Sequence, residues 1–184
     1  MHPLFEYTHL DHAPISADLS YSPSSRSVLD RRTHAAIPYD TLDEPATEPA
    51  LYTQLVLKCE LFPWEVVVRP HVSNACLSPT KTARFPFTRR RPITNLDVLC
   101  AVYDTLAKCV TDEEWARLGQ RSRAQRRVTH AYEQRCIKLG GGWESGVRRI
   151  DWLDGRTRLV GIGMTPSKNG VASGTATLVF KTPA

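Results

Sequence analysis

The sequence predicts an α+β domain in which an antiparallel sheet carries a cluster of about three helices on one face. The first observation is that stretches rich in β-branched and aromatic residues lie at both ends of the folded region, two before the helices and three after them. The second is that apolar residues recur at helical spacing in between, most clearly from Thr94 to Val110. Strands, then helices, then strands is the order typical of an antiparallel sheet covered by helices on one face.

Residues 1–48 are expected to form a disordered or extended N-terminal arm, and residues 49–184 a single α+β domain. Serine is frequent from Ser16 to Ser27 and prolines interrupt the segment, so no periodic apolar face is long enough to bury. His9 and His12 have a spacing seen in metal sites, but no acidic or cysteine ligand accompanies them. We therefore expect no metal site in the arm.

The two N-terminal strands are expected at Leu51–Cys59 and Trp64–Val68, and a long, basic, proline-rich connection runs from Arg69 to Pro92. Long loops inside compact domains are often either functional or disordered. The basic end of this connection is therefore the first candidate for contacting a partner, with a plain solvated loop as the alternative. The candidate partner-contact residues are Arg84, Phe85, Phe87, Arg89, Arg90 and Arg91.

Three helices should follow this connection. The first spans Thr94–Val110, with Thr94 or Asn95 as N-cap and an apolar stripe that places it in the core. Thr111 and Glu114 have the spacing of a capping box and begin a second, short helix. The third helix has arginines on its outer side, and glycines end it. Its apolar side is expected to comprise Ala124, Val128, Ala131, Tyr132 and Cys136.

Three strands are expected after the helices, at Val147–Leu153, Thr157–Met164 and Thr175–Phe180, with a tight turn at Asp154-Gly155 joining the first two. Alternation along the first strand would place Arg149 and Asp151 on one face, and we name these two residues as a candidate pocket. Gly161-Ile162-Gly163 lacks the third glycine and the following helix of a dinucleotide-binding motif. Close packing or a β-bulge is the expected role of these glycines.

The amino-acid composition indicates the cellular compartment and the classes of partner to expect. The five cysteines are odd in number and form no C-x-x-C pair, which fits free thiols in a reducing compartment. No signal peptide or membrane-spanning stretch is visible, so an intracellular, cytoplasmic or nuclear, location is expected. The net charge of +5 raises the question of nucleic acid, but no aromatic residue is interleaved with the arginines from Arg121 to Arg127. Nucleic acid is therefore an unlikely partner.

Three segments together resemble a domain of unknown function that is abundant in mushroom-forming fungi. They are Ile93–Leu99 opening a helix, the arginine-rich helix that ends in Tyr132–Arg135, and the V-x-R-x-D-x-L-x-G stretch from Val147 to Gly155 followed by Leu159–Ile162. The resemblance covers roughly Leu51 to Phe180. That family has no assigned activity, cofactor or catalytic residues, so the resemblance supports the domain and implies no chemistry.

Three functions stay open. A protein-interaction or scaffold module with a protein partner of unknown identity is the first, because no catalytic constellation is present and both the arm and the basic loop are available for contacts. A small-molecule-binding protein or an enzyme of unknown class is the second, and a weak electrostatic nucleic-acid binder is the third. No catalytic, cofactor-binding or metal-binding residue is assigned, and no cofactor is expected. The second function would need distant residues to converge, namely His71, Cys100, Cys109, His130, Asp151 and Asp154.

Overall fold

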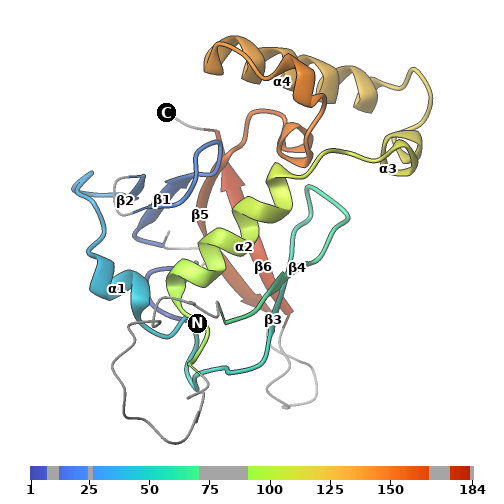
Figure 1. The fold of residues 1–184 in the computed structure, drawn as a ribbon. Helices are drawn as coiled ribbons and strands as arrows, with labels where there is room; N and C mark the ends of the chain where they lie inside the picture. Colours follow the sequence, from blue (N-terminus) through green and yellow to red (C-terminus); the bar gives the residue numbers. More distant parts are fainter. Residues whose placement is uncertain (8–12, 25–26, 71–90, 166–174, 183–184) are drawn as a thin grey trace, which may run out of the picture.

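A six-stranded sheet forms the centre of the molecule in the computed structural model, which describes residues 1–7, 13–24, 27–70, 91–165 and 175–182 (Figure 1). The strand order across the sheet is β2-β1-β5-β6-β3-β4. The strands are β1 (Ile15–Asp18), β2 (Val28–Asp30), β3 (Leu55–Lys58), β4 (Val66–Val68), β5 (Arg158–Thr165) and β6 (Thr175–Lys181). The helices are α1 (Tyr39–Asp43), α2 (Asn95–Ala107), α3 (Asp112–Arg117) and α4 (Arg123–Leu139), with the 3₁₀ helices η1 (Trp143–Ser145) and η2 (Arg149–Leu153).

The sheet is mixed, so the α+β class is confirmed while the prediction of a purely antiparallel sheet is wrong. β3 pairs with β6 in parallel, with Leu57 opposite Ala176, and the other described strand pairs are antiparallel. A parallel pair needs a crossover connection rather than a hairpin. Here the chain passes through α2, α3, α4 and β5 between the two strands. The residue pattern of a strand does not indicate whether it pairs in parallel or antiparallel, so the sequence could not predict this pairing.

The segment before residue 49, expected to be an arm, contributes β1 and β2 to one edge of the sheet. Ile15 and Ala17 are buried while the residues between and after them are less so, which is the period of two of a strand with one covered face. Tyr7 also donates its backbone N–H to the Ile162 carbonyl, 3.2 Å away. The sheet therefore contains strands from both sides of the boundary that the sequence predicted at residue 48.

Helix α2 lies across one face of the sheet and supplies the centre of the core (Figure 1). Leu99, Val102 and Leu106 are fully buried, as the apolar stripe predicted. Thr94 is the N-cap: its hydroxyl accepts the Asp97 N–H, and the Asp97 carboxylate accepts the Thr94 N–H. The helix predicted over Thr94–Val110 is thus confirmed, with an end at Ala107.

The stretch Val147–Leu153 is not a strand, so in the described part of the chain β5 and β6 follow the helices where three strands were expected. Arg149–Leu153 forms the 3₁₀ helix η2, because the Asp151 carboxylate accepts the Arg148 N–H and closes the first turn. The turn at Asp154-Gly155 is present, with positive φ at both residues, and it leads from η2 into β5. The hydrogen bond to the Asp151 side chain thus favours a 3₁₀ helix here, although the alternation of residue types predicted a strand.

Helix α4 packs chiefly on η2 and not on the sheet, which differs from the expected cluster of helices on one face. In Figure 1 it lies beyond the end of the sheet, with α3 beside the chain that leads to it. Within its 17 residues only Val128 and Cys136 are buried. A helix with so little buried surface is held by specific contacts at a few residues, described next.

Candidate functional site

The residues predicted to contact a partner lie mostly outside the described residues. Arg84, Phe85, Phe87, Arg89 and Arg90 fall in the undescribed range 71–90. Arg91 is described, and the next paragraph gives its contacts.

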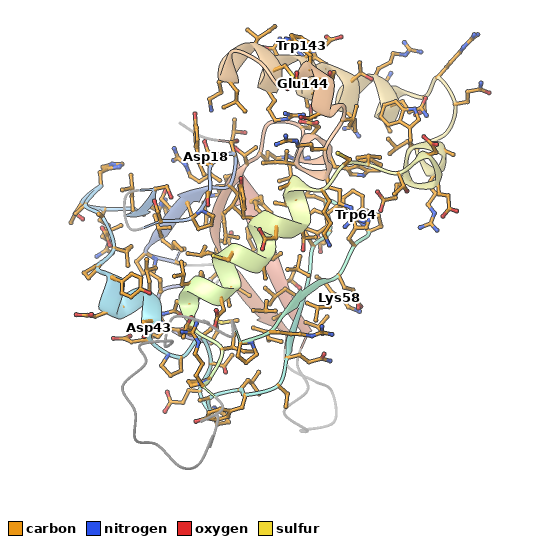
Figure 2. All side chains as sticks on the ribbon, in the orientation of Figure 1. Asp18, Asp43, Lys58, Trp64, Trp143 and Glu144 are labelled. Atoms are coloured by element: carbon orange, nitrogen blue, oxygen red, sulfur yellow. The ribbon has the colours of Figure 1, made fainter. Side chains whose placement is uncertain are left out.

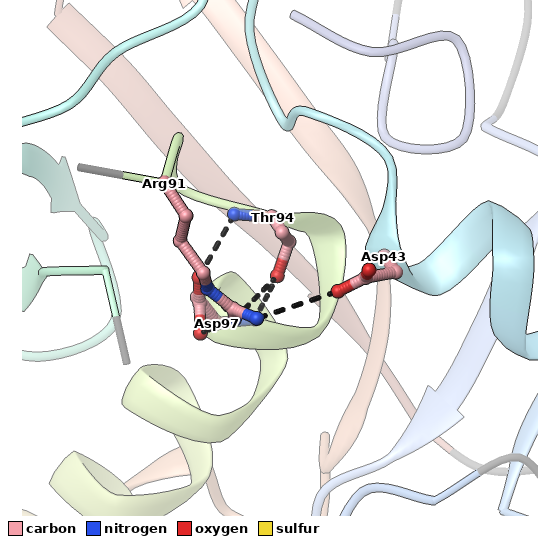
Figure 3. Close-up of polar contacts among 4 residues, drawn as sticks. All are labelled: Asp43, Arg91, Thr94 and Asp97. Atoms are coloured by element: carbon pink, nitrogen blue, oxygen red, sulfur yellow. Dashed lines mark hydrogen bonds and ion pairs between the residues drawn. The ribbon is translucent and has the colours of Figure 1, made fainter. Parts of the chain in front are cut away.

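Arg91 is tied to the N-terminus of α2 (Figure 3). Its Nη2 lies 2.9 Å and 3.1 Å from the two carboxylate oxygens of Asp97, and its Nη1 lies 3.5 Å from Asp43. The guanidinium therefore joins the cap of α2 to the end of α1. Arg91 therefore has a structural role, and the partner contact that was predicted for it stays a prediction.

The candidate pocket residues Arg149 and Asp151 point to different partners, because η2 replaces the expected strand. The Arg149 guanidinium carbon lies 4.6 Å from the centroid of the Trp64 ring, and Glu114 accepts hydrogen bonds from both Arg149 and the Trp64 indole. Burial would raise the pKa of Glu114, but these two bonds and one from the Thr111 amide lower it. This cluster fastens α3 to the core.

Asp151 instead borders a cleft of about 700 Å³ between α4 and the turn from η2 into β5. Ser20, two residues after the end of β1, also lines the cleft, and Asp18 at the end of β1 lies 3.7 Å from Lys138 of α4 (Figure 2). Arg149 does not line the cleft. The residues that line it come from three separate parts of the chain: Ser20, His130, Ala131, Gln134, Arg135, Lys138, Ile150, Asp151, Asp154, Gly155 and Thr157.

A buried ion pair forms the floor of the cleft. Arg135 donates to both carboxylate oxygens of Asp151, at 2.7 Å and 3.0 Å, and the two side chains are only 9% and 1% exposed. Arg135 also donates to the Gly146 carbonyl at 3.1 Å. The Asp151 hydrogen bond raises the pKa of Arg135. The pair is fully committed to holding α4 on η2. The sequence analysis did not single out Arg135, because its partner Asp151 lies 16 residues later and no local pattern connects the two.

A second, looser pair lies at the cleft mouth. Lys138 Nζ is 3.7 Å from Asp18 Oδ2 and 5.8 Å from the centroid of the Tyr21 ring. Partial burial would raise the pKa of Asp18, but the hydrogen bonds from the Ser20 amide and the Thr157 hydroxyl outweigh it and hold that pKa below its ordinary value.

The lowered pKa of Asp18 predicts a pH-dependent contribution to stability. The ionised carboxylate stabilises the fold above the pKa of the unfolded chain, and this contribution is lost as the pH falls through the folded pKa. We expect the difference in free energy of unfolding between the wild type and Asp18→Asn to shrink between about pH 5 and pH 2. Urea denaturation across that range measures it. A difference that does not change with pH would contradict the prediction.

Three side chains at the cleft have open hydrogen-bonding groups. Within the described part of the chain, His130, Gln134 and Asp154 form no side-chain hydrogen bond or ion pair. His130 and Gln134 are one turn apart on α4, and Asp154 lies across from them at the end of η2. The convergence proposed from sequence is thus partial, since His130, Asp151 and Asp154 meet here while Cys100 and Cys109 do not and His71 lies outside the described residues.

None of the four described cysteines lines the cleft, and Cys76 lies outside the described residues. Burial raises the pKa of Cys59 and Cys100, which makes the reactive thiolate scarcer. Cys136 is buried, and Cys109 donates to the Ser145 carbonyl at 3.4 Å. Among the residues that the structure describes, no group of His, Cys, Asp and Glu is arranged to hold a metal ion.

Large apolar side chains are exposed on α4 and the adjoining η1. Ile137 is 65% exposed and Trp143 is 50% exposed. Trp143 lies at the outer edge of the molecule in Figure 2, and its ring meets Tyr132 edge-on at 5.6 Å. Arg123 and Arg126 are exposed on the same helix. We call Arg123, Arg126, His130, Glu133 and Ile137, which fall within one sector of the helix at 100° per residue, the α4 outer face.

The fold and the cleft define a small α+β protein with one mixed sheet and a polar cleft where α4 meets η2. No described helix is both long and apolar enough to cross a membrane. The chain belongs to a family of unknown function, DUF6699, which matches residues 15–171. Comparisons with curated proteins and with solved structures give no match. The resemblance to a domain of unknown function is confirmed, although the match begins before Leu51, and its abundance in fungi stays a prediction.

Proposed function

We propose that this protein is a protein-interaction module and that the α4 outer face is its main contact surface. The observation that supports this most is the exposure of Ile137 at the C-terminal end of a helix surface that carries Arg123 and Arg126 at its other end. Apolar and arginine side chains together are enriched where protein interfaces carry their binding energy. A helix with two buried residues presents most of its surface to a partner.

The chemistry of the surface indicates the chemistry of the partner. Arg123 and Arg126 face outward with Glu133 as the one acidic residue of the α4 outer face, and the whole chain carries a net charge of +5. A partner with carboxylates around an apolar pocket would match this face, with the charges speeding the encounter and Ile137 filling the pocket. The segment from Arg84 to Arg90 is a second proposed contact, since it has the same sign of charge.

Partner capture followed by affinity measurement tests this function. Proteins that bind the full wild-type chain would be identified and then titrated against an Arg126→Glu/Ile137→Asp variant. We expect a loss of affinity of at least about tenfold, because truncated interface anchors cost more than about 1 kcal/mol. Tyr39→Ser, at an exposed aromatic residue of α1, is the matched control and should bind as the wild type does.

Two outcomes would redirect the proposal. Equal affinity of the wild type and the α4 variant would show that the contact lies elsewhere, and a deletion of residues 84–90 then tests the second segment. Capture of RNA or DNA that persists at physiological salt would favour a nucleic-acid binder. Binding to nucleic acid that disappears as salt rises would be only the weak electrostatic contact expected of a basic surface.

A further inference from the structure

In the cleft between α4 and the turn from η2 into β5, Asp154 is the one lining carboxylate that has no ion-pair partner among the described residues. Arg135 is paired with Asp151 at its floor, and Lys138 faces Asp18 at its mouth. An anionic ligand would meet the carboxylates of Asp151 and Asp154, while Arg135 and Lys138 are already paired with Asp151 and Asp18. The cleft is therefore poorly suited to an anionic ligand, and the carboxylate of Asp154 is available to accept hydrogen bonds.

The groups left open in the cleft are hydrogen-bonding ones. The Gln134 amide both donates and accepts, a neutral His130 ring does the same, and the Asp154 carboxylate accepts. None of the three has a side-chain partner among the described residues. Ligands that satisfy such a set must carry several groups that donate and accept at once, and hydroxyl groups are the simplest of these.

The size and the remaining walls agree with a small molecule. Ligand sites commonly enclose roughly 300–1,000 Å³, and this cleft encloses about 700 Å³. Ala131, Ile150 and Gly155 give it apolar surface between the polar groups. A sugar ring has this mixed character, since its C–H faces are apolar and its rim carries hydroxyl groups.

We propose that the cleft binds a neutral polyhydroxylated molecule of the size of a mono- or disaccharide. Asp154 and Gln134 hydrogen-bond its hydroxyl groups from opposite walls, and the side chain of Ile150 contacts the ring. The Arg135–Asp151 pair fixes the distance between the walls by holding α4 on η2. His130 lies at the border of the cleft and the α4 outer face, but Gln134, Asp154 and Ile150, which carry this site, are not part of that face, so either proposal stands if the other fails.

NMR titration of the full chain with glucose, maltose and cellobiose tests the site, with inorganic phosphate as the anionic probe. We expect saturable shifts of the Gln134 and Gly155 amides with at least one sugar and weaker effects of phosphate. Gln134→Leu and Asp154→Asn should each weaken binding at least about tenfold. Asparagine tolerates the positive φ of 52° at position 154, so the turn is kept.

Glu133→Leu is the control, because Glu133 is the exposed neighbour of Gln134 on α4 and does not line the cleft. It should bind the sugars with wild-type affinity. Absence of saturable shifts with all three sugars would overturn the proposal. So would phosphate binding more tightly than the sugars, or equal sugar affinity of Gln134→Leu and the wild type.

Discussion

Replacing Arg135 by methionine is expected to lower the free energy of unfolding by about 3–5 kcal/mol, the range seen when one partner of a buried ion pair is removed. Methionine keeps most of the length of the side chain and removes the guanidinium. Asp151, whose side chain is 1% exposed, would then keep the Arg148 N–H as its main partner and stay buried with an unbalanced charge. The Gly146 carbonyl would lose its partner as well.

Urea denaturation of Arg135→Met beside Arg126→Met measures this effect. Both substitutions remove an arginine from α4, but Arg126 is exposed, and its side-chain hydrogen bond to the described residues is the one to the Arg121 carbonyl, at 3.3 Å. The control should therefore change stability by less than about 1 kcal/mol. An Arg135→Met/Asp151→Leu double variant should lose less than the sum of the single losses, because no buried charge is left alone. Additive losses would show that the pair is not the origin of the effect.

The elements that sequence predicts well are those whose signals are local. Helix α2 has an N-cap, an apolar stripe and a proline before it, and all three agree with the structure. The capping box of Thr111 and Glu114 also forms as expected. The same carboxylate of Glu114 additionally binds Trp64, which lies 50 residues earlier and was not foreseeable from the cap.

The elements that sequence predicts poorly depend on distant partners. Strand β1 has four residues and looks polar, and it forms because β2 and β5 pair with its two edges. The residue types of β3 and β6 do not indicate that the two strands pair in parallel. η2 was misjudged because the Asp151 carboxylate satisfies the Arg148 N–H, and alternation of residue types does not report such a bond.

The cleft is the least predictable feature, because its walls come together only in the fold. Thr157 donates to Asp18 across a sequence separation of 139 residues. Of the two residues that the sequence suggested as a candidate pocket, Asp151 lines the cleft and Arg149 does not. The open groups of Gln134 and His130 become recognisable only when the charged neighbours are seen to be paired with one another.

Replacing Gly161 by alanine is expected to lower the free energy of unfolding by about 2–6 kcal/mol, the sum of overpacking at about 1–3 kcal/mol and backbone strain of about the same size. A Cβ on Gly161 would lie 2.8 Å from the Tyr7 Cβ, 3.0 Å from the Ala13 Cβ and 3.1 Å from the Phe5 carbonyl oxygen. The φ of +150° is also one that residues with a side chain rarely adopt.

The position of Gly161 explains why the chain cannot easily relax around an added methyl group. It lies at the register shift between Leu159 and Gly161, so the expectation of close packing or a bulge is confirmed. Next to it, the Ile162 N–H donates to the Phe5 carbonyl and the Tyr7 N–H to the Ile162 carbonyl, at 2.6 Å and 3.2 Å. Moving Tyr7 away from the new methyl group would therefore break the bonds that fix the N-terminal segment to β5.

Gly163→Ala is the matched control, since it adds the same methyl group to the same strand two residues later. The nearest atom to a Cβ there is the Thr177 carbonyl oxygen at 3.9 Å, an ordinary contact. Thermal unfolding should show Gly161→Ala well below both the wild type and Gly163→Ala, by about 2–4 °C for each kcal/mol lost in a chain of this size. Equal melting temperatures for the two variants would mean that residues 1–7 do not pack against β5 in solution. If instead Gly161→Ala also increases proteolytic cleavage within those residues, the loss of stability is assigned to release of the N-terminal segment from the sheet.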